Sequence, residues 1–217
     1  MKIEYCNLRI PNCRKDFCRE CCIDKEVKIY SLDLILKEIP VEGIRIDEYL
    51  YNPWFPHKIN LSLLLKRKSN GECYFLNENG CSIYEKKPMV CDLYPGMIFN
   101  YLNELYFSMK SCYSGKNFVR VPLKKVIENF DPKEILKFHI AVKIDKIITP
   151  YVEKIKDVKD RVSIEKEILE VSGINELIEK IDDAEMNIKG NIVKLDFDMR
   201  EFRVFKKTLK INLKTYF

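Results

Sequence analysis

The second half of the chain carries the apolar spacing of helices. The run Asp131-Pro132-Lys133-Glu134 combines an N-cap residue, Pro at the first helical position and Glu at the third, which is a strong helix start. From there apolar residues recur at helical spacing as far as Pro150. The same spacing predicts three further helices, over residues 152–160, 164–171 and 175–182.

The end of the chain mixes two periodicities. Gly190-Asn191 predicts a turn, and the alternation of apolar and polar residues from Val193 to Met199 predicts a strand after it. Residues 200–217 fit either a helix or a strand.

The first half is built of shorter stretches. VKIY at 27–30 and NLSLLLKR at 60–67 read as strands. Ser31 is a suitable N-cap for a helix that Pro40 ends. We expect a second short helix over residues 47–51, and loops over 6–22 and 54–57.

Two hairpins are predicted in the middle of the chain. The turn Asn77-Glu78-Asn79-Gly80 separates two β-prone runs and places Cys81 just beyond it. Pro88 then predicts a short helical turn leading to Cys91, which Tyr94-Pro95-Gly96 closes. Alternating apolar residues on both sides of a turn near 102–104 predict the second hairpin, which would bring Cys91 and Cys112 close together.

These patterns predict an α+β protein. All nine cysteines lie at or before Cys112, and this shift in composition places a boundary near Gly115. We therefore expect a cysteine-cluster domain of short strands, hairpins and short helices over residues 1–115. A mainly helical region over 116–217 would follow and could pack on it.

Composition places the chain among globular proteins. It has 217 residues, of which 47% are hydrophobic, enough to bury a core. No apolar run is long enough to cross a bilayer, and the first residues do not resemble a signal peptide. We expect a cytoplasmic, reducing location and no membrane partner. There, closely spaced cysteines bind metal more often than they form disulfides.

Two groups of four cysteines carry the candidate chemistry: Cys13, Cys18, Cys21, Cys22 and Cys73, Cys81, Cys91, Cys112. Thiolates are strong ligands for soft metals, so the two groups suggest a metal site built from distant segments. Cys21 and Cys22 are adjacent and would point to opposite faces of an extended chain. We expect them to serve two sites, or one of them to support the other.

The charge of the chain depends on those thiolates. The formal net charge is +5 with neutral cysteines. Eight metal-bound thiolates and two divalent ions would lower it to roughly +1. The basic balance by itself is therefore weak support for a nucleic-acid partner.

The cysteine pattern resembles the CxxCxxCC proteins, also called the YkgJ-like family, described as zinc- or iron-chelating domains. The resemblance rests on Cys18-x-x-Cys21-Cys22, on Gly80-Cys81-Ser82-Ile83-Tyr84, and on Lys87-Pro88, Cys91 and Tyr94-Pro95, with Cys112 as the closing cysteine. It covers about residues 10–120 and implies a metal site without an agreed reaction. One branch, the flagellin lysine methylases, implies protein N-methylation with S-adenosylmethionine.

The chain also departs from that pattern. Four residues separate Cys13 from Cys18 where the family has two, so Cys6 could take the place of Cys13. Arg19 stands where the family often has Gly, and Asp92 where it often has a basic residue.

The identity of the metal stays open between two candidates. Structural zinc sites usually draw on two close cysteine pairs, and here only Cys18 and Cys21 form one. The long, irregular spacings favour an iron–sulfur cluster over zinc. Disulfides or uncoordinated thiols are the remaining alternative.

Other sites have fewer candidates. His57 and His139 are the only histidines, and no Gly-rich phosphate loop appears. Basic residues interleaved with aromatics near the C-terminus fit a nucleic-acid surface or a solvated helix face over a small core. This set comprises Lys206, Lys207, Lys210 and Lys214 with Phe202, Phe205, Tyr216 and Phe217. The function classes left open are a structural metal centre, a redox or modifying enzyme, and a metal-stapled module that binds protein or nucleic acid.

Overall fold

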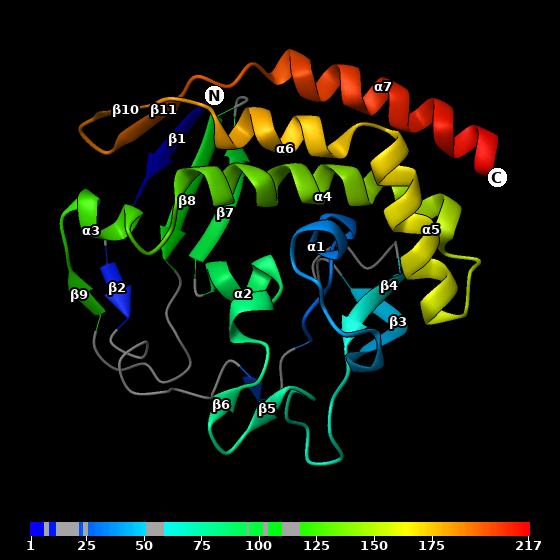
Figure 1. Cartoon of the computed structure of the whole chain (residues 1–217). Coiled ribbons are helices and arrows are strands. Elements are labelled where there is room, and N and C mark those ends of the chain that lie inside the picture. Colours follow the sequence, from blue (N-terminus) through cyan, green and yellow to red (C-terminus); the bar gives the residue numbers. More distant parts are fainter. Residues whose placement is uncertain are drawn as a thin grey trace.

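A computed structural model describes residues 1–6, 9–11, 22–23, 26–50, 59–94, 96–101, 104–109 and 118–217 (Figure 1). The fold is α+β, as the sequence predicts. The helices are α1 (Ser31–Leu36), α2 (Met89–Leu93), α3 (Leu123–Ile127), α4 (Pro132–Val152), α5 (Val158–Val171), α6 (Ile174–Asp182) and α7 (Met199–Tyr216), with short 3-10 turns η3 (Val41–Gly43) and η4 (Tyr84–Lys86). The strands are β1 (Lys2–Tyr5), β2 (Arg9–Pro11), β3 (Ile44–Leu50), β4 (Ile59–Leu65), β5 (Leu76–Asn77), β6 (Gly80–Cys81), β7 (Gly96–Tyr101), β8 (Glu104–Met109), β9 (Phe118–Arg120), β10 (Met186–Lys189) and β11 (Ile192–Leu195).

The largest sheet among the described residues has the strand order β10-β11-β1-β8-β7. Its central strand β1 runs antiparallel to β11 and parallel to β8. Ile3 and Tyr5 are fully buried and alternate with partly buried neighbours, which is the pattern of a strand with one face on the core. Strands from both sides of the boundary expected near Gly115 thus share this sheet, and the division into two domains stays a prediction.

A helical layer covers the sheet. Figure 1 shows α4, α6 and α7 running side by side across one end of the molecule, with α5 beside them. The predicted start of α4 is confirmed: the carboxylate of Asp131 accepts a hydrogen bond of 2.8 Å from the amide of Lys133. The sheet and these helices enclose the larger of two hydrophobic cores.

The smaller core lies under the β3–β4 hairpin. Its buried residues include Ile44, Leu63, Phe75 and Ile83, and the side chains of Cys73 and Cys81 pack against it. The two-residue hairpin β5–β6 is confirmed at the predicted turn, with Gly80 at a φ of 110° that favours glycine. The β7–β8 hairpin and the short helix α2 after Pro88 are confirmed as well.

Several local predictions are wrong. Residues 47–50 are not helical but belong to β3, because they pair residue by residue with β4. Ser31 is the first residue of α1 and Tyr30 is its N-cap, and α1 ends at Leu36. VKIY runs beside β4 with one bridge, from Lys28 to Leu64, and forms no strand of its own.

The C-terminal half also differs in its boundaries. The helix expected over residues 152–160 is replaced by the end of α4, a short turn and the start of α5, which continues to Val171. Residues 9–11, expected as loop, form β2, and Met199 begins α7 instead of ending a strand. Residues 7–8 and 12–21 of the 6–22 loop, and the 54–57 loop with His57, lie outside the described residues.

Buried polar contacts join the smaller core to the helical layer. Lys28 forms an ion pair of 2.6 Å with Asp145 of α4. The hydroxyl of Ser31 donates to Glu165 of α5, which also pairs with Arg161 at 2.8 Å. In the described part of the chain, no helix combines the length and apolar character needed to cross a bilayer.

Candidate metal centre

The structure describes four of the eight predicted ligands. These are Cys22, Cys73, Cys81 and Cys91, each partly buried. Cys13, Cys18, Cys21 and Cys112 lie outside the described residues.

The last cysteine of the first group lies beside the first cysteine of the second. The amide of Cys73 donates a hydrogen bond of 2.8 Å to the carbonyl oxygen of Cys22. Next to this hydrogen bond, Ile23 and Glu72 form a β-bridge, and Cys73 itself forms a second β-bridge with Arg67. Segments far apart in the sequence therefore meet with their cysteines at the contact.

Cys81 reaches the same region through the β5–β6 hairpin. It pairs with Leu76, whose amide donates to the carbonyl oxygen of Cys73 at 3.0 Å. The amide of Ser82 donates to Phe75 at 2.8 Å and closes the hairpin onto the smaller core. A continuous path of backbone hydrogen bonds thus connects Cys22, Cys73 and Cys81.

Cys91 is carried by α2, which is attached to α1 by a buried carboxylate. Asp33 is fully buried, and its two oxygens accept hydrogen bonds from the amides of Met89 at 2.8 Å and Tyr30 at 2.9 Å. Burial is the largest influence on this group and raises the pKa of Asp33 to about 7, against the two backbone hydrogen bonds. The start of α2 is therefore held in place by a group that the sequence analysis did not single out.

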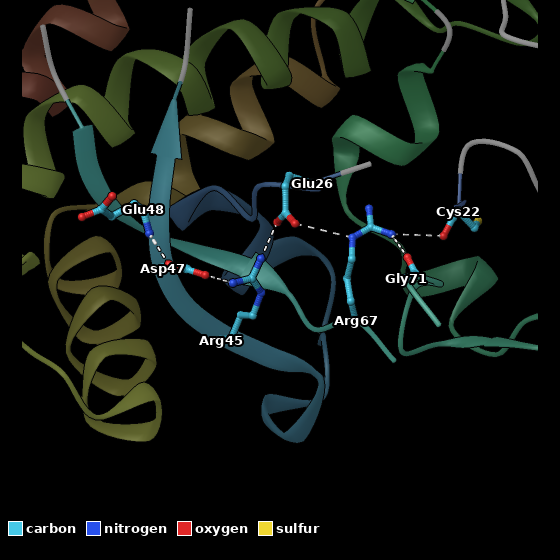
Figure 2. Close-up of polar contacts among 7 residues, drawn as sticks. All are labelled: Cys22, Glu26, Arg45, Asp47, Glu48, Arg67 and Gly71. Atoms are coloured by element: carbon cyan, nitrogen blue, oxygen red, sulfur yellow. Dashed lines mark hydrogen bonds and ion pairs between the residues drawn. The ribbon is translucent and has the colours of Figure 1, made fainter. Parts of the chain in front are cut away.

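Arg67 fastens the Cys22 segment to the hairpin region. Figure 2 shows its guanidinium between Glu26 and the carbonyl oxygens of Cys22 and Gly71. Its Nη1 lies 3.5 Å from the oxygen of Cys22, and its Nε lies 3.6 Å from Glu26. Arg45 also holds Glu26 but makes no contact with Cys22 in this network. No sequence signal marks Arg67, because its role depends on a segment distant in the chain.

Cys6 continues strand β1 and bonds to β8. Its amide donates to the carbonyl oxygen of Phe107 at 2.8 Å and extends the β1–β8 pairing. Burial, and then the charge of Glu4, raise the pKa of its thiol, an environment that disfavours the thiolate needed for metal binding.

Backbone hydrogen bonds bring Cys22, Cys73 and Cys81 into one region without completing a ligand shell, and Cys91 is placed separately, on α2. Among the described residues, no three of the cysteine, histidine and acidic side chains are grouped closely enough to hold a metal ion. The full set of eight ligands stays a prediction. His139, the histidine that the structure describes, is buried in α4 with no hydrogen-bond partner on Nε2.

Comparison with protein families connects this arrangement to known chemistry. Residues 12–113 match the CxxCxxCC family model, described as a "putative zinc- or iron-chelating domain". The match covers 102 of the 217 residues, slightly less than half of the chain. The match spans all eight predicted ligands and excludes Cys6. No curated protein and no solved structure matches the chain significantly.

The matched segment includes both cysteine groups and most of the smaller core, to which α5 adds Val162. It also contains β7 and β8, which belong to the large sheet. Chelation of zinc or iron is the chemistry with which the family is described.

Proposed function

We propose that the chain holds an iron–sulfur cluster whose ligands are drawn from both cysteine groups, and that this centre staples the CxxCxxCC domain. The contact between Cys73 and Cys22 is the observation that carries the proposal. A metal bound on both sides of that contact would cross-link segments that otherwise meet through few hydrogen bonds. The small size of the adjoining core makes such a cross-link valuable, because few apolar side chains are buried there.

Backbone pairs at the flanks of the remaining cysteines support the same location. Gly96, which closely follows Cys91, pairs with Met109, which precedes Cys112 by three residues. Pro11, which precedes Cys13 by two residues, pairs with Phe118. An extended residue spans at most about 3.6 Å, so short tethers connect Cys13 and Cys112 to these pairs.

The protein's own residues would orient the ligands and balance their charge. Arg67 holds the carbonyl oxygen of Cys22, and Asp33 holds the start of the helix that carries Cys91. Lys37 and Lys87 share the carboxylate of Asp92, the residue after Cys91, and the excess positive charge of this group would offset part of the charge of the thiolates. An iron–sulfur cluster, when bound, supplies one-electron transfer in addition to cross-linking.

Metal analysis of protein purified without oxygen tests the proposal. We expect iron and acid-labile sulfide, with a visible absorption that reductant bleaches. Cys73→Ser should lose this absorption, whereas Cys6→Ser, outside the matched domain, should keep it. Stoichiometric zinc in a colourless protein would mean that the cysteines hold a structural zinc ion instead of an iron–sulfur cluster. Protein without metal, with thiols oxidised in pairs, would contradict metal binding altogether.

Protein-lysine N-methylation is the alternative that the flagellin lysine methylase resemblance suggests. It requires S-adenosylmethionine, and the chain has only seven scattered glycines and no Gly-rich loop of the usual kind. Calorimetric titration of the metal-loaded protein with S-adenosylmethionine tests this alternative. Saturable binding would support the methylation alternative. The absence of any heat of binding would count against it.

A further inference from the structure

The C-terminal helix α7 carries the whole positive excess of the chain. It contains six basic residues and one acidic residue, Glu201, a difference equal to the formal net charge of +5 for all 217 residues. The remaining residues therefore balance to zero even before any cysteine is ionised. A partner that responds to the charge of this protein would respond mainly to α7.

The basic residues of α7 form a straight row. Arg200, Arg203, Lys207, Lys210 and Lys214 follow one another at intervals of three and four residues and are all exposed. These intervals place them on one helix face, along about 21 Å of its axis. We call these five residues the basic ridge.

In the part of the chain that the structure describes, neighbouring acids neutralise only the first residue of the ridge. Arg200 pairs with Asp198 at the start of its own helix, and Glu201 is engaged by Lys180 of α6. Within the described residues, Arg203, Lys207, Lys210 and Lys214 form no salt bridge. Next to the ridge, burial and the charges of Lys206 and Lys146 lower the pKa of Lys143 on α4, which is a sign of crowded positive charge.

The opposite face of α7 is fully used by the fold. Phe202, Phe205, Leu209 and Leu213 are buried in the larger core, with Phe202 and Phe205 each 5% exposed. The two aromatic rings therefore cannot stack on bases, which corrects that part of the interleaved pattern. Tyr216 and Phe217 are exposed, but the hydroxyl of Tyr216 donates to Glu167 of α5 and the ring of Phe217 packs against Tyr151 of α4. A row of cations whose aromatic neighbours are held by the fold suits the phosphate backbone of a duplex better than single strands.

We propose that the basic ridge binds the phosphate backbone of a nucleic-acid duplex without sequence preference. The ridge is convex, since α7 is the outermost helix of its layer (Figure 1), and an α-helix fits the major groove of B-form DNA. A duplex presents charge at the close, regular spacing that a row of cations can neutralise.

A membrane surface fits α7 less well. An interfacial helix buries its apolar face among lipid chains, but the apolar face of α7 is already in the core. Val204 and Ile211, 65% and 56% exposed, are the large apolar side chains that α7 leaves exposed beside the ridge. Figure 1 also places α7 at the opposite end of the molecule from the β5–β6 hairpin, so binding at the ridge would leave the cysteine region accessible.

Binding of the full chain to a labelled random-sequence DNA duplex, measured over a range of salt concentrations, tests the proposal. Four phosphate contacts predict a slope of log affinity against log salt of about −3.6, or ~150-fold weaker binding for a fourfold rise in salt. The ridge variant R203Q/K207Q/K210Q/K214Q should lose the binding and most of the slope. The variant R203K, which keeps the charge, should bind like the natural chain.

The matched control is K124Q/K125Q/K154Q/K159Q. It removes the same charge from exposed positions outside α7, and it should keep most of the affinity and the slope. Equal losses in the two variants would mean that net charge alone is sensed and would overturn the proposal. So would binding to phosphatidylserine vesicles or to polyglutamate without binding to the duplex. Circular dichroism of both variants verifies that they are folded.

Discussion

The amide of Cys73 donates a hydrogen bond of 2.8 Å to the carbonyl oxygen of Cys22. This bond joins two cysteine groups that are separated by α1 and by the β3–β4 hairpin in the sequence. It brings candidate metal ligands from distant segments together. Among the described residues, the two groups meet at this hydrogen bond. Substituting a residue that supports the bond should therefore change how tightly metal is retained.

Arg67 is the first such residue. Replacing it with Gln removes the guanidinium that contacts the carbonyl oxygen of Cys22 and the carboxylate of Glu26. We expect Arg67→Gln to weaken metal retention by roughly 10-fold, the lower range for residues that orient ligands. Competition with a chelator measures the change. Arg45→Gln is the control, because Arg45 contacts Glu26 but not Cys22; an equal loss in both variants would contradict a specific role of Arg67.

Asp33 should matter for stability. In Asp33→Asn a single carbonyl oxygen must serve the two amides of Tyr30 and Met89, so one buried donor loses its acceptor. We expect a loss of about 1–3 kcal/mol in the free energy of unfolding, measured with urea. Asp92→Asn removes partly exposed ion pairs with Lys37 and Lys87 and should cost about 0–1 kcal/mol. A smaller effect at Asp33 than at Asp92 would contradict its role in holding α2.

The sequence anticipated elements whose signal is local. The turn at Gly80, the cap at Asp131 and the turn at Gly190 each depend on a few neighbouring residues, and all three appear as predicted. The candidate ligands were likewise visible as a spacing pattern, and the family match covers them. The buried apolar residues of α7 also follow helical spacing. The sequence alone left residues 200–217 open between helix and strand, and the packing of these side chains in the larger core favours the helix.

Elements that depend on distant pairing were missed. β1 has four residues, and its partners lie near Leu105 and Val193, so nothing nearby in the sequence marks it. Residues 47–50 carry charges compatible with a helix, yet pairing with β4 makes them a strand. Arg67 and Asp33 were missed for the same reason, since their functions arise from contacts between segments.

Metal removal should loosen one region selectively. The amides of Cys73, Leu76 and Ser82 hold the cysteine segments together beside the smaller core. We expect faster hydrogen exchange at these amides after chelation, while α4, which is buried in the larger core, stays protected. Hydrogen-exchange mass spectrometry of metal-loaded and chelated protein measures the difference. Uniform loss of protection would instead indicate that the metal stabilises the whole chain.

His139 should make the protein acid-sensitive. Burial, and then the charges of Lys143 and Lys146, lower the pKa of this histidine to about 4. Its folded-state pKa lies below the unfolded value, so its contribution to stability is present above about pH 6.5 and is lost as the pH falls toward 4. We expect the free energy of unfolding to fall by roughly 1–2 kcal/mol between pH 7 and pH 5 on its account.

Urea unfolding of His139→Leu at both pH values isolates that contribution. The substitution removes the titrating ring and its buried, unbonded Nε2, so the variant should lose this part of the pH dependence. A variant with the same pH dependence as the natural chain would assign the acid sensitivity to other groups.

The most direct test of the central claim compares the metal content of Cys22→Ser, Cys73→Ser and the double variant, all purified without oxygen. If both cysteine groups contribute ligands to the same centre, each single substitution should remove the same metal, and the double variant should lose no more than either one. Losses that add up in the double variant would mean that the two groups bind metal separately, and would contradict the joint centre.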